Sequence, residues 1–128
     1  MIVEVKKVEW DEFYPAVLPL FLEEVEETKA LSFPLDVDDN LGRILVQSGA
    51  SSLFVALVNS TIIGYCIWAH GPNVMVMGKT IAQQGPWFVS KDFRKSGAAL
   101  ALLKKGIEYC KEIGFPIFSA STKHSVKS

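Results

Sequence analysis

The sequence predicts an α/β domain in which helices pack on a mixed sheet of the α+β type. Strand-like and helix-like segments follow one another in the order β-α-α-β-β-β-α-β, without an internal repeat. Of the 128 residues, 49% are hydrophobic and 21% are charged, which is the balance of a globular chain. This length fits one compact core, so we expect a single domain over residues 1–128.

The N-terminal third is expected to hold one strand and two helices. Residues 2–8 alternate in part between apolar and polar side chains, which predicts a strand. Asp11 is a suitable N-cap for a helix to about Thr28, because apolar residues recur there at spacings near 3.6. Pro19 should bend that helix. A weaker helix is expected over 37–47.

A stretch without Asp, Glu, Lys or Arg runs from Ile44 to Gly78 and contains an expected hairpin. Residues 53–58 and 62–68 are rich in β-branched and aromatic residues and flank a short polar turn at 59–61. That turn and a polar loop expected at 70–73 leave apolar pieces far shorter than the roughly 20 residues of a membrane-spanning helix. We therefore expect no membrane partner.

Another strand is expected over residues 80–89, and 74–77 should extend a strand before it. Gly85–Pro86 interrupts the run. Because proline donates no hydrogen bond to a ladder, we expect a bulge or a splay at this point.

The last predicted elements are a helix and a short strand. The helix should run from Gly97 or Ala98 to about Ile113, with charged side chains on one face and apolar ones on the other. Residues 116–120 should form a strand parallel to 80–89, because a helical crossover joins the two.

Charge and cysteine content narrow the class of function. A net charge of −1 argues against a general affinity for nucleic acid or for an anionic membrane. The first seven residues carry acids and bases where a signal peptide needs an apolar run, so we expect a cytoplasmic protein. Cys66 and Cys110 lie in apolar segments and should be buried free thiols; we expect no disulfide and no metal site.

The stretch from Trp87 to Leu100 has the most chemical content. An apolar strand leads through a short polar loop into a helix whose first turn consists of small residues. Gly97 can adopt a positive φ, and a helix start offers unpaired N–H groups and the positive end of the helix dipole. Arg94 and Lys95 add mobile positive charge. This pattern suits a phosphate or pyrophosphate site, and equally an ordinary strand–loop–helix turn with solvated cations.

The segment Arg94-Lys95-Ser96-Gly97-Ala98-Ala99 resembles the pyrophosphate-loop pattern Q/R-x-x-G-x-G/A of the GNAT superfamily of acyl-CoA N-acyltransferases. Residues 89–94 resemble the strand end and turn that precede that loop. The order of the elements is similar over roughly the whole chain. The turn at 93–95 and the ending at 123–125 are most similar to phage-encoded members, which implies a phage-encoded protein acting in the host cell.

The resemblance implies an N-acetyltransferase that moves an acetyl group from acetyl-CoA to a primary amine in a ternary complex. The backbone amides of residues 94–99 would hold the pyrophosphate. Trp87, Phe88 and Val89 would pair with the pantetheine arm, and the Val89 amide would polarise the thioester carbonyl. The acceptor would be an amine-bearing small molecule or protein.

The chain departs from the family pattern in two places. Many relatives carry a glutamate base on the splayed strand, whereas residues 82–86 read Ala-Gln-Gln-Gly-Pro, and glutamine cannot act as a base. The chain also stops at Ser128. In the family, a helix with a tyrosine that protonates the leaving thiolate would follow at about this point, and then two more strands. We therefore expect either a fragment or a natural short form whose missing strands come from elsewhere, with an open sheet edge that favours homodimers or aggregation. The catalytic residues stay unassigned, with His124 and His70 as weak candidates that fit a tail and a loop better.

Two further sets of residues are open to more than one interpretation. Glu23, Glu24, Glu26 and Glu27 fit a solvated helix face, although in the family the first helices border the acceptor site, where acids would attract a cationic amine. Three tryptophans are expected in the core or as the lining of a cleft: Trp10, Trp68 and Trp87.

Two other functions remain open at this point. A catalytically inactive module of the same fold, which binds CoA or serves as a virion-associated structural part, would explain the absent base and the short C-terminus. A nucleotide-binding regulator would use the same anion site.

Overall fold

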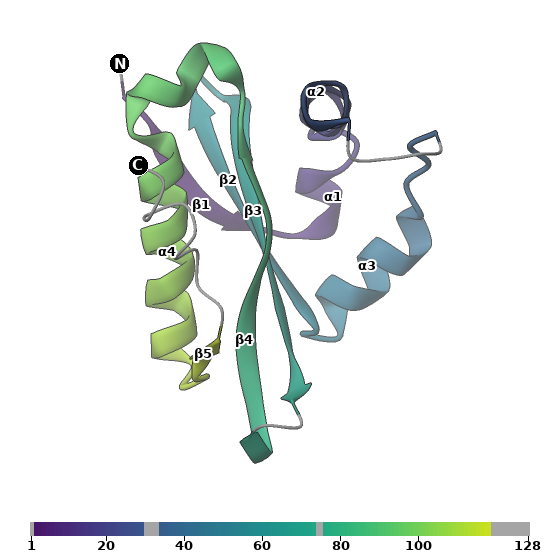
Figure 1. Cartoon of the computed structure of the whole chain (residues 1–128), viewed down its shortest axis with the longest axis vertical. Coiled ribbons are helices and arrows are strands. Elements are labelled where there is room, and N and C mark those ends of the chain that lie inside the picture. Colours follow the sequence, from purple (N-terminus) through teal and green to yellow (C-terminus); the bar gives the residue numbers. More distant parts are fainter. Residues whose placement is uncertain (1, 30–33, 74–75, 119–128) are drawn as a thin grey trace.

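The computed structural model describes residues 2–29, 34–73 and 76–118. Its elements follow the predicted order, except that three helices precede β2 where two were expected and that a 3₁₀ helix precedes the last α-helix (Figure 1). They are β1 (Glu4–Val8), α1 (Trp10–Phe13), α2 (Leu18–Thr28), α3 (Asp39–Gln47), β2 (Ser51–Val58), β3 (Thr61–Asn73), β4 (Val76–Val89), the 3₁₀ helix η1 (Lys91–Ser96), α4 (Ala98–Glu112) and β5 (Ile117–Phe118).

The strands form one mixed sheet in the order β1-β2-β3-β4-β5. The first four are antiparallel neighbours, and β5 pairs parallel to β4 through Ala82–Ile117 and Gln83–Phe118. The predicted α/β class with a mixed sheet is confirmed, including the parallel last strand. Residues 119–120 of that predicted strand lie outside the described residues.

Helices cover both faces of the sheet (Figure 1). On one face, α4 packs over a cluster that includes Phe54, Cys66 and Trp68. On the other face, α1, α2 and α3 lie over a second cluster, in which Phe13 and Tyr65 are central. The sheet therefore separates two apolar cores. The C-terminal end of β4, near Val89, lies between α2 and α4.

The single helix expected from Asp11 to Thr28 is two helices, so that prediction was wrong. Glu9 caps α1 through a capping box with Glu12, in place of Asp11. Pro19 lies in the first turn of α2, where its missing N–H leaves no intrahelical bond unmade. The prolines at 15 and 19 thus separate two helices where a bent one was expected.

The predicted hairpin is confirmed, and its second strand is longer than expected. Asn59 and Ser60 adopt positive φ angles of 51° and 66°, as a two-residue hairpin turn requires. β3 continues to Asn73, so the loop expected at 70–73 is in fact strand. The pairing of β3 with β2 ends at Ala69, and beyond this residue β3 pairs only with β4. Proline at 72 therefore lies where β3 has a neighbour on one side, so it does not interrupt a central ladder.

The bulge expected at Gly85–Pro86 is confirmed. Cys66 pairs with Trp87, and Trp68 pairs with Gln84, so β4 uses one residue more than β3 over this interval. The extra residue reverses which face the following side chains point to. Ala82 and Val89, seven positions apart, consequently lie in the same core under α4.

The long helix α4 agrees with the predicted bounds. It begins at Ala98 after Gly97, whose φ is +85°, and its buried residues recur at spacings of four: Ala98, Leu102, Gly106 and Cys110. None of the helices in the described part of the chain is long and apolar enough to cross a membrane.

Candidate functional site

Five of the nine residues predicted to bind the cofactor line one groove at the end of β4, whereas residues 95–98 do not line it. This cavity of about 340 Å³, which we call the β4 groove, is lined by Glu27, Trp87, Phe88, Val89, Arg94 and Ala99. Trp87 and Val89 belong to the core under α4, whereas Phe88 belongs to the core on the opposite face. The groove therefore lies at the edge of β4, between α2 and the start of α4.

The backbone amide and carbonyl of Val89 are directed toward the groove. The Ser90 amide donates to the Ile63 carbonyl on β3 at 2.9 Å. Successive residues of a strand direct their polar groups to opposite edges, so the Val89 amide and carbonyl point away from β3. Arg94 Nε reaches the Val89 carbonyl at 3.0 Å, which agrees with this direction. The amide expected to polarise a thioester thus faces the groove side of the strand.

The loop before α4 is a 3₁₀ helix, which changes the set of amides that can hold an anion. In η1 the later amides donate to carbonyls three residues earlier. The Ala98 amide donates to Ser96 Oγ at 3.2 Å. For the Ala99 and Leu100 amides, no acceptor is found in the ranges that the structure describes. A pyrophosphate would find its free donors in the first turn of α4.

Gly97 fits a close approach by a ligand. Its φ of +85° is the left-handed conformation predicted for this glycine, and a Cβ built on it meets nothing within 4 Å. The surface over the start of α4 is therefore open, with the positive end of a 15-residue helix beneath it. Lys95 and Ser96 complete the turn on the N-terminal side.

The side chain of Arg94 is held in place, contrary to the mobile cation expected from the sequence. Its Nη2 contacts both carboxylate oxygens of Glu27 at 2.8 and 2.9 Å, and its guanidinium lies 5.3 Å from the centre of the Phe88 ring. Together with the bond to Val89, these contacts fix the guanidinium beside the strand edge. Glu27 already neutralises part of the positive charge that a phosphate would meet.

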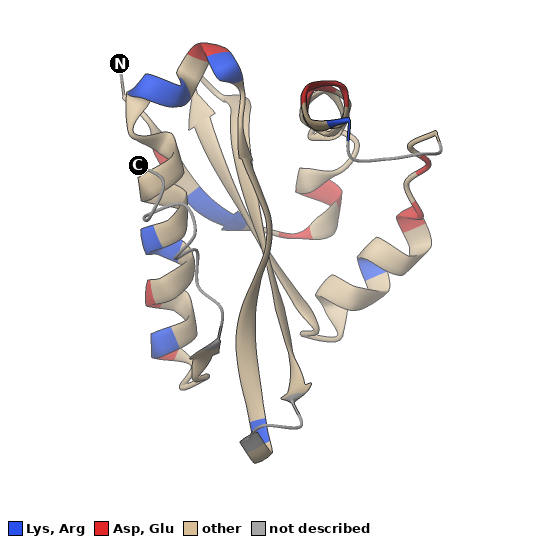
Figure 2. Cartoon of the chain, in the orientation of Figure 1, with Lys and Arg blue, Asp and Glu red and all other residues tan. Residues whose placement is uncertain are grey.

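The acidic residues of α2 form only in part the solvated face that the sequence favours, because Glu23 and Glu24 are half-buried. Figure 2 shows these acids as a red band on α2 and the basic residues of η1 in blue at the top of the view. Glu23 accepts from Ser90 Oγ and from the Lys91 amide, both at 2.9 Å. Glu26 and Glu27 keep the expected exposure; Glu26 pairs with Lys29, and Glu27 pairs with Arg94. The others tie α2 to the sheet and to η1.

Sequence reasoning missed the partners of Glu24 and Glu27 because each lies about 40 to 70 residues away in the chain. The available signal was their spacing: residues 23, 24 and 27 share one side of a helix. The Tyr65 hydroxyl donates to Glu24. Burial, followed by this bond to the carboxylate, raises the pKa of Tyr65 far above its usual range.

His70 is a buried strand residue, which corrects its expected place in a loop. It pairs with Ala82 on β4, and its Nε2 lies 2.7 Å from Ser52 Oγ. The rings of Tyr109 and Phe115 lie against it. Burial, followed by the nearby charge of Lys7, lowers the pKa of His70. His70 is remote from the β4 groove; His124 lies outside the described residues.

The remaining predicted residues take the positions expected of them. Trp10 and Trp68 are core residues, and Trp87 is half-buried in the groove wall. Cys66 and Cys110 are buried free thiols, and burial raises the pKa of Cys66 to about 12. In the described ranges, no three His, Cys, Asp or Glu side chains gather as metal ligands.

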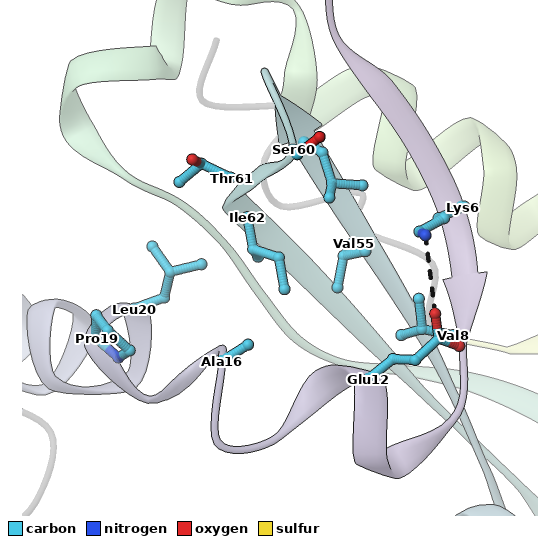
Figure 3. A pocket seen from close by; sticks show the side chains of 11 residues that line it. Lys6, Val8, Glu12, Ala16, Pro19, Leu20, Val55, Ser60, Thr61 and Ile62 are labelled. Atoms are coloured by element: carbon cyan, nitrogen blue, oxygen red, sulfur yellow. Dashed lines mark ion pairs between the residues drawn. The ribbon is translucent and has the colours of Figure 1, made fainter.

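A second cavity, of about 500 Å³, lies under α1 and α2 (Figure 3). Lys6 and Glu12 form an ion pair at its rim, and Val8, Val55 and Ile62 form its apolar floor. None of its lining residues comes from β4, η1 or α4. It is therefore separate from the β4 groove.

Several solved structures with the same fold are named as acetyltransferases. The chain is 22% identical to a ribosomal-protein-alanine N-acetyltransferase from Brucella melitensis biovar Abortus 2308, with a TM-score of 0.73 over 93% of this chain and 78% of that one. It is 17% identical to the aminoglycoside acetyltransferase meta-AAC0020 from a soil metagenome, with a TM-score of 0.74 over 91% and 76%. A predicted acetyltransferase from Clostridium acetobutylicum, solved with acetyl-CoA, is 16% identical with a TM-score of 0.71 over 94% and 81%.

These similarities establish the fold, which is the mixed α/β fold of those three structures. The profile of the acetyltransferase (GNAT) family matches residues 3–127, and the chain belongs to that family. Acyl transfer is the general activity that this membership gives. No protein with a curated description matches the chain.

Proposed function

We propose that this protein transfers an acetyl group from acetyl-CoA to a primary amine. The observation that carries the proposal is the β4 groove, which runs along an outward-facing strand edge to the start of α4. A strand edge can pair with the amide groups of a pantetheine arm, as an added strand would. The open helix start beside Gly97 suits the pyrophosphate of the same molecule.

The reaction needs little covalent participation by the protein. The amine nitrogen attacks the thioester carbonyl, so that a C–N bond forms and the C–S bond breaks. The amine gives up a proton to solvent, and the sulfur leaves as a thiolate that takes up a proton. The Val89 amide would stabilise the oxyanion, and the groove would align the two reactants.

The test is a calorimetric titration with acetyl-CoA, followed by an assay of thiol release with a panel of amines. Gly97→Glu should weaken acetyl-CoA binding by at least about a hundredfold, because it places a carboxylate where the pyrophosphate would lie. Gly49→Glu is the matched control. Gly49 has nearly the same φ, +84°, and the same open surroundings, but lies in the turn before β2. Equal losses in both variants, or unchanged affinity in Gly97→Glu, would contradict the assignment of the loop.

A second candidate is a module that binds CoA without transferring an acetyl group. It is favoured by the absence of a carboxylate from residues 82–86 and by the pairing of Arg94 with Glu27. This candidate predicts acetyl-CoA binding with no thiol release for any amine. Acetylated product from any amine of the panel, identified by mass spectrometry, would exclude it.

A further inference from the structure

A third cavity lies between α2 and the sheet, on the face opposite α4. Its volume is about 300 Å³, and we call it the Glu24 pocket. It is lined by Phe21, Glu24, Val25, Thr28, Leu35, Tyr65, Ile67 and Pro86. The volume is at the lower end of the range for small-molecule sites, roughly 300–1,000 Å³, so the pocket suits a small ligand.

The walls of this pocket are mostly apolar, and its anionic group is held in place. Phe21 stacks edge-on against Tyr65 at 5.2 Å between ring centres. Tyr65 is 1% exposed, and its hydroxyl donates to Glu24. The carboxylate is therefore fixed by a buried partner while it borders an apolar space. A carboxylate in such surroundings is complementary to a cation with an apolar body.

The Glu24 pocket and the β4 groove are lined by the same two elements, α2 and β4. Pro86 lines the pocket, and the next residue, Trp87, lines the groove. On α2, Glu24 borders the pocket and Glu27, three residues later, borders the groove. The two cavities share no lining residue, but both border α2 and the bulged part of β4.

We infer that the Glu24 pocket is the acceptor site, and that it selects small primary amines carried on an apolar body. This inference rests on the proposed function, which makes the β4 groove the acetyl-CoA site. The ammonium group binds the Glu24 carboxylate, while Phe21, Ile67 and Pro86 contact the apolar part. A polyhydroxylated amine would have to bury hydroxyl groups against apolar walls without partners, which opposes its binding.

The test is a set of binding titrations with three small probes, with NMR or calorimetry used to measure the affinities. These are 2-phenylethylamine, the uncharged 2-phenylethanol, and the polar amine glucosamine. Glu24→Gln keeps an acceptor for the Tyr65 hydroxyl but removes the charge. It should weaken the binding of 2-phenylethylamine roughly ten- to a hundredfold, which is the range for a hydrogen bond to a charged group, and leave the affinity for 2-phenylethanol unchanged.

Glu26→Gln is the matched control, because Glu26 lies on the same helix but is exposed and pairs with Lys29. It should leave all three affinities unchanged. If Glu24→Gln does not fold, Tyr65→Phe replaces it. That variant releases the carboxylate from its buried partner, and should weaken the amine several-fold without affecting the alcohol.

Tight binding of glucosamine, or affinity for 2-phenylethylamine that is insensitive to both variants, would overturn the inference. Titration of the same proteins with acetyl-CoA separates it from the proposed function. Normal acetyl-CoA binding with no amine binding rejects the Glu24 pocket alone. Amine binding that depends on Glu24, in a protein that does not bind acetyl-CoA, supports the pocket and rejects the proposed function.

Discussion

The two helical layers differ in how firmly they are attached to the sheet. On one face, α4 buries four residues, whereas α3 on the other face buries none and exposes Leu41 and Ile44 by 50% and 60%. In both layers a tryptophan ring lies on a helix glycine: Trp68 on Gly106, and Trp10 on Gly42. The comparison indicates that α4 is firmly fixed beneath the β4 groove and the turn at Gly97, while α3 is held mainly at its margin.

The largest expected effect is on the α4 side. A Cβ at Gly106 would lie 2.1 Å from Trp68 Nε1, and Trp68 is completely buried. Neither the ring nor the helix can move without opening the core. We therefore expect Gly106→Ala to destabilise the protein by about 3 kcal/mol, the upper part of the range for overpacking, as measured by urea unfolding.

A double-mutant cycle identifies the cause of that loss. Trp68→Phe removes the part of the ring that contacts residue 106. If the clash is responsible, Gly106→Ala should cost much less in the Trp68→Phe background than in the wild type. Equal costs in both backgrounds would show that the ring is not the obstacle.

A smaller effect on the same side is a pH dependence due to His70. Because burial lowers the pKa of His70 in the folded state, the unfolded chain takes up a proton first as the pH falls below the ordinary value near 6.5. Stability present above that pH is then lost as the pH decreases, with a slope of at most about 1.4 kcal/mol per pH unit for one proton.

The contribution of His70 is measured by comparison with His70→Gln, which can keep the hydrogen bond to Ser52. Unfolding curves at pH 7.5, 6.5 and 5.5 should show the loss in the wild type and a flatter profile in the variant. Parallel profiles would assign the pH dependence to other groups.

The sequence predicted the α4 side better than the α1–α3 side, for a physical reason. The hairpin, the bulge at Gly85–Pro86 and the turn at Gly97 are determined by local preferences of proline, glycine and β-branched residues. Each of those signals lies within a few consecutive residues. They were sufficient to place the strand edge and the helix start that form the groove.

The other side depends on contacts between distant residues. Glu24 reaches Tyr65 and Glu27 reaches Arg94 only after α2 has packed on the sheet, so the run of acids by itself indicates a solvated face. Pro72 favours a loop at His70, although pairing with β4 keeps the strand intact. Local preference could not indicate either outcome, because tertiary packing decides them.

The comparison is sharpened most by the smallest expected effect, that of Gly42→Ala. The new Cβ would lie 2.4 Å from Trp10 Cη2, almost as close as the Gly106 contact. Both glycines are inside helices, so both substitutions gain about 1 kcal/mol of helix propensity, and the difference between them reports packing alone. Because α3 buries no residue, it can shift outward and relieve the clash, although Trp10 Nε1 still donates to Asp39 at 2.7 Å. We expect a net loss of about 1 kcal/mol or less in urea unfolding. A loss as large as that of Gly106→Ala would mean that α3 is as firmly fixed as α4.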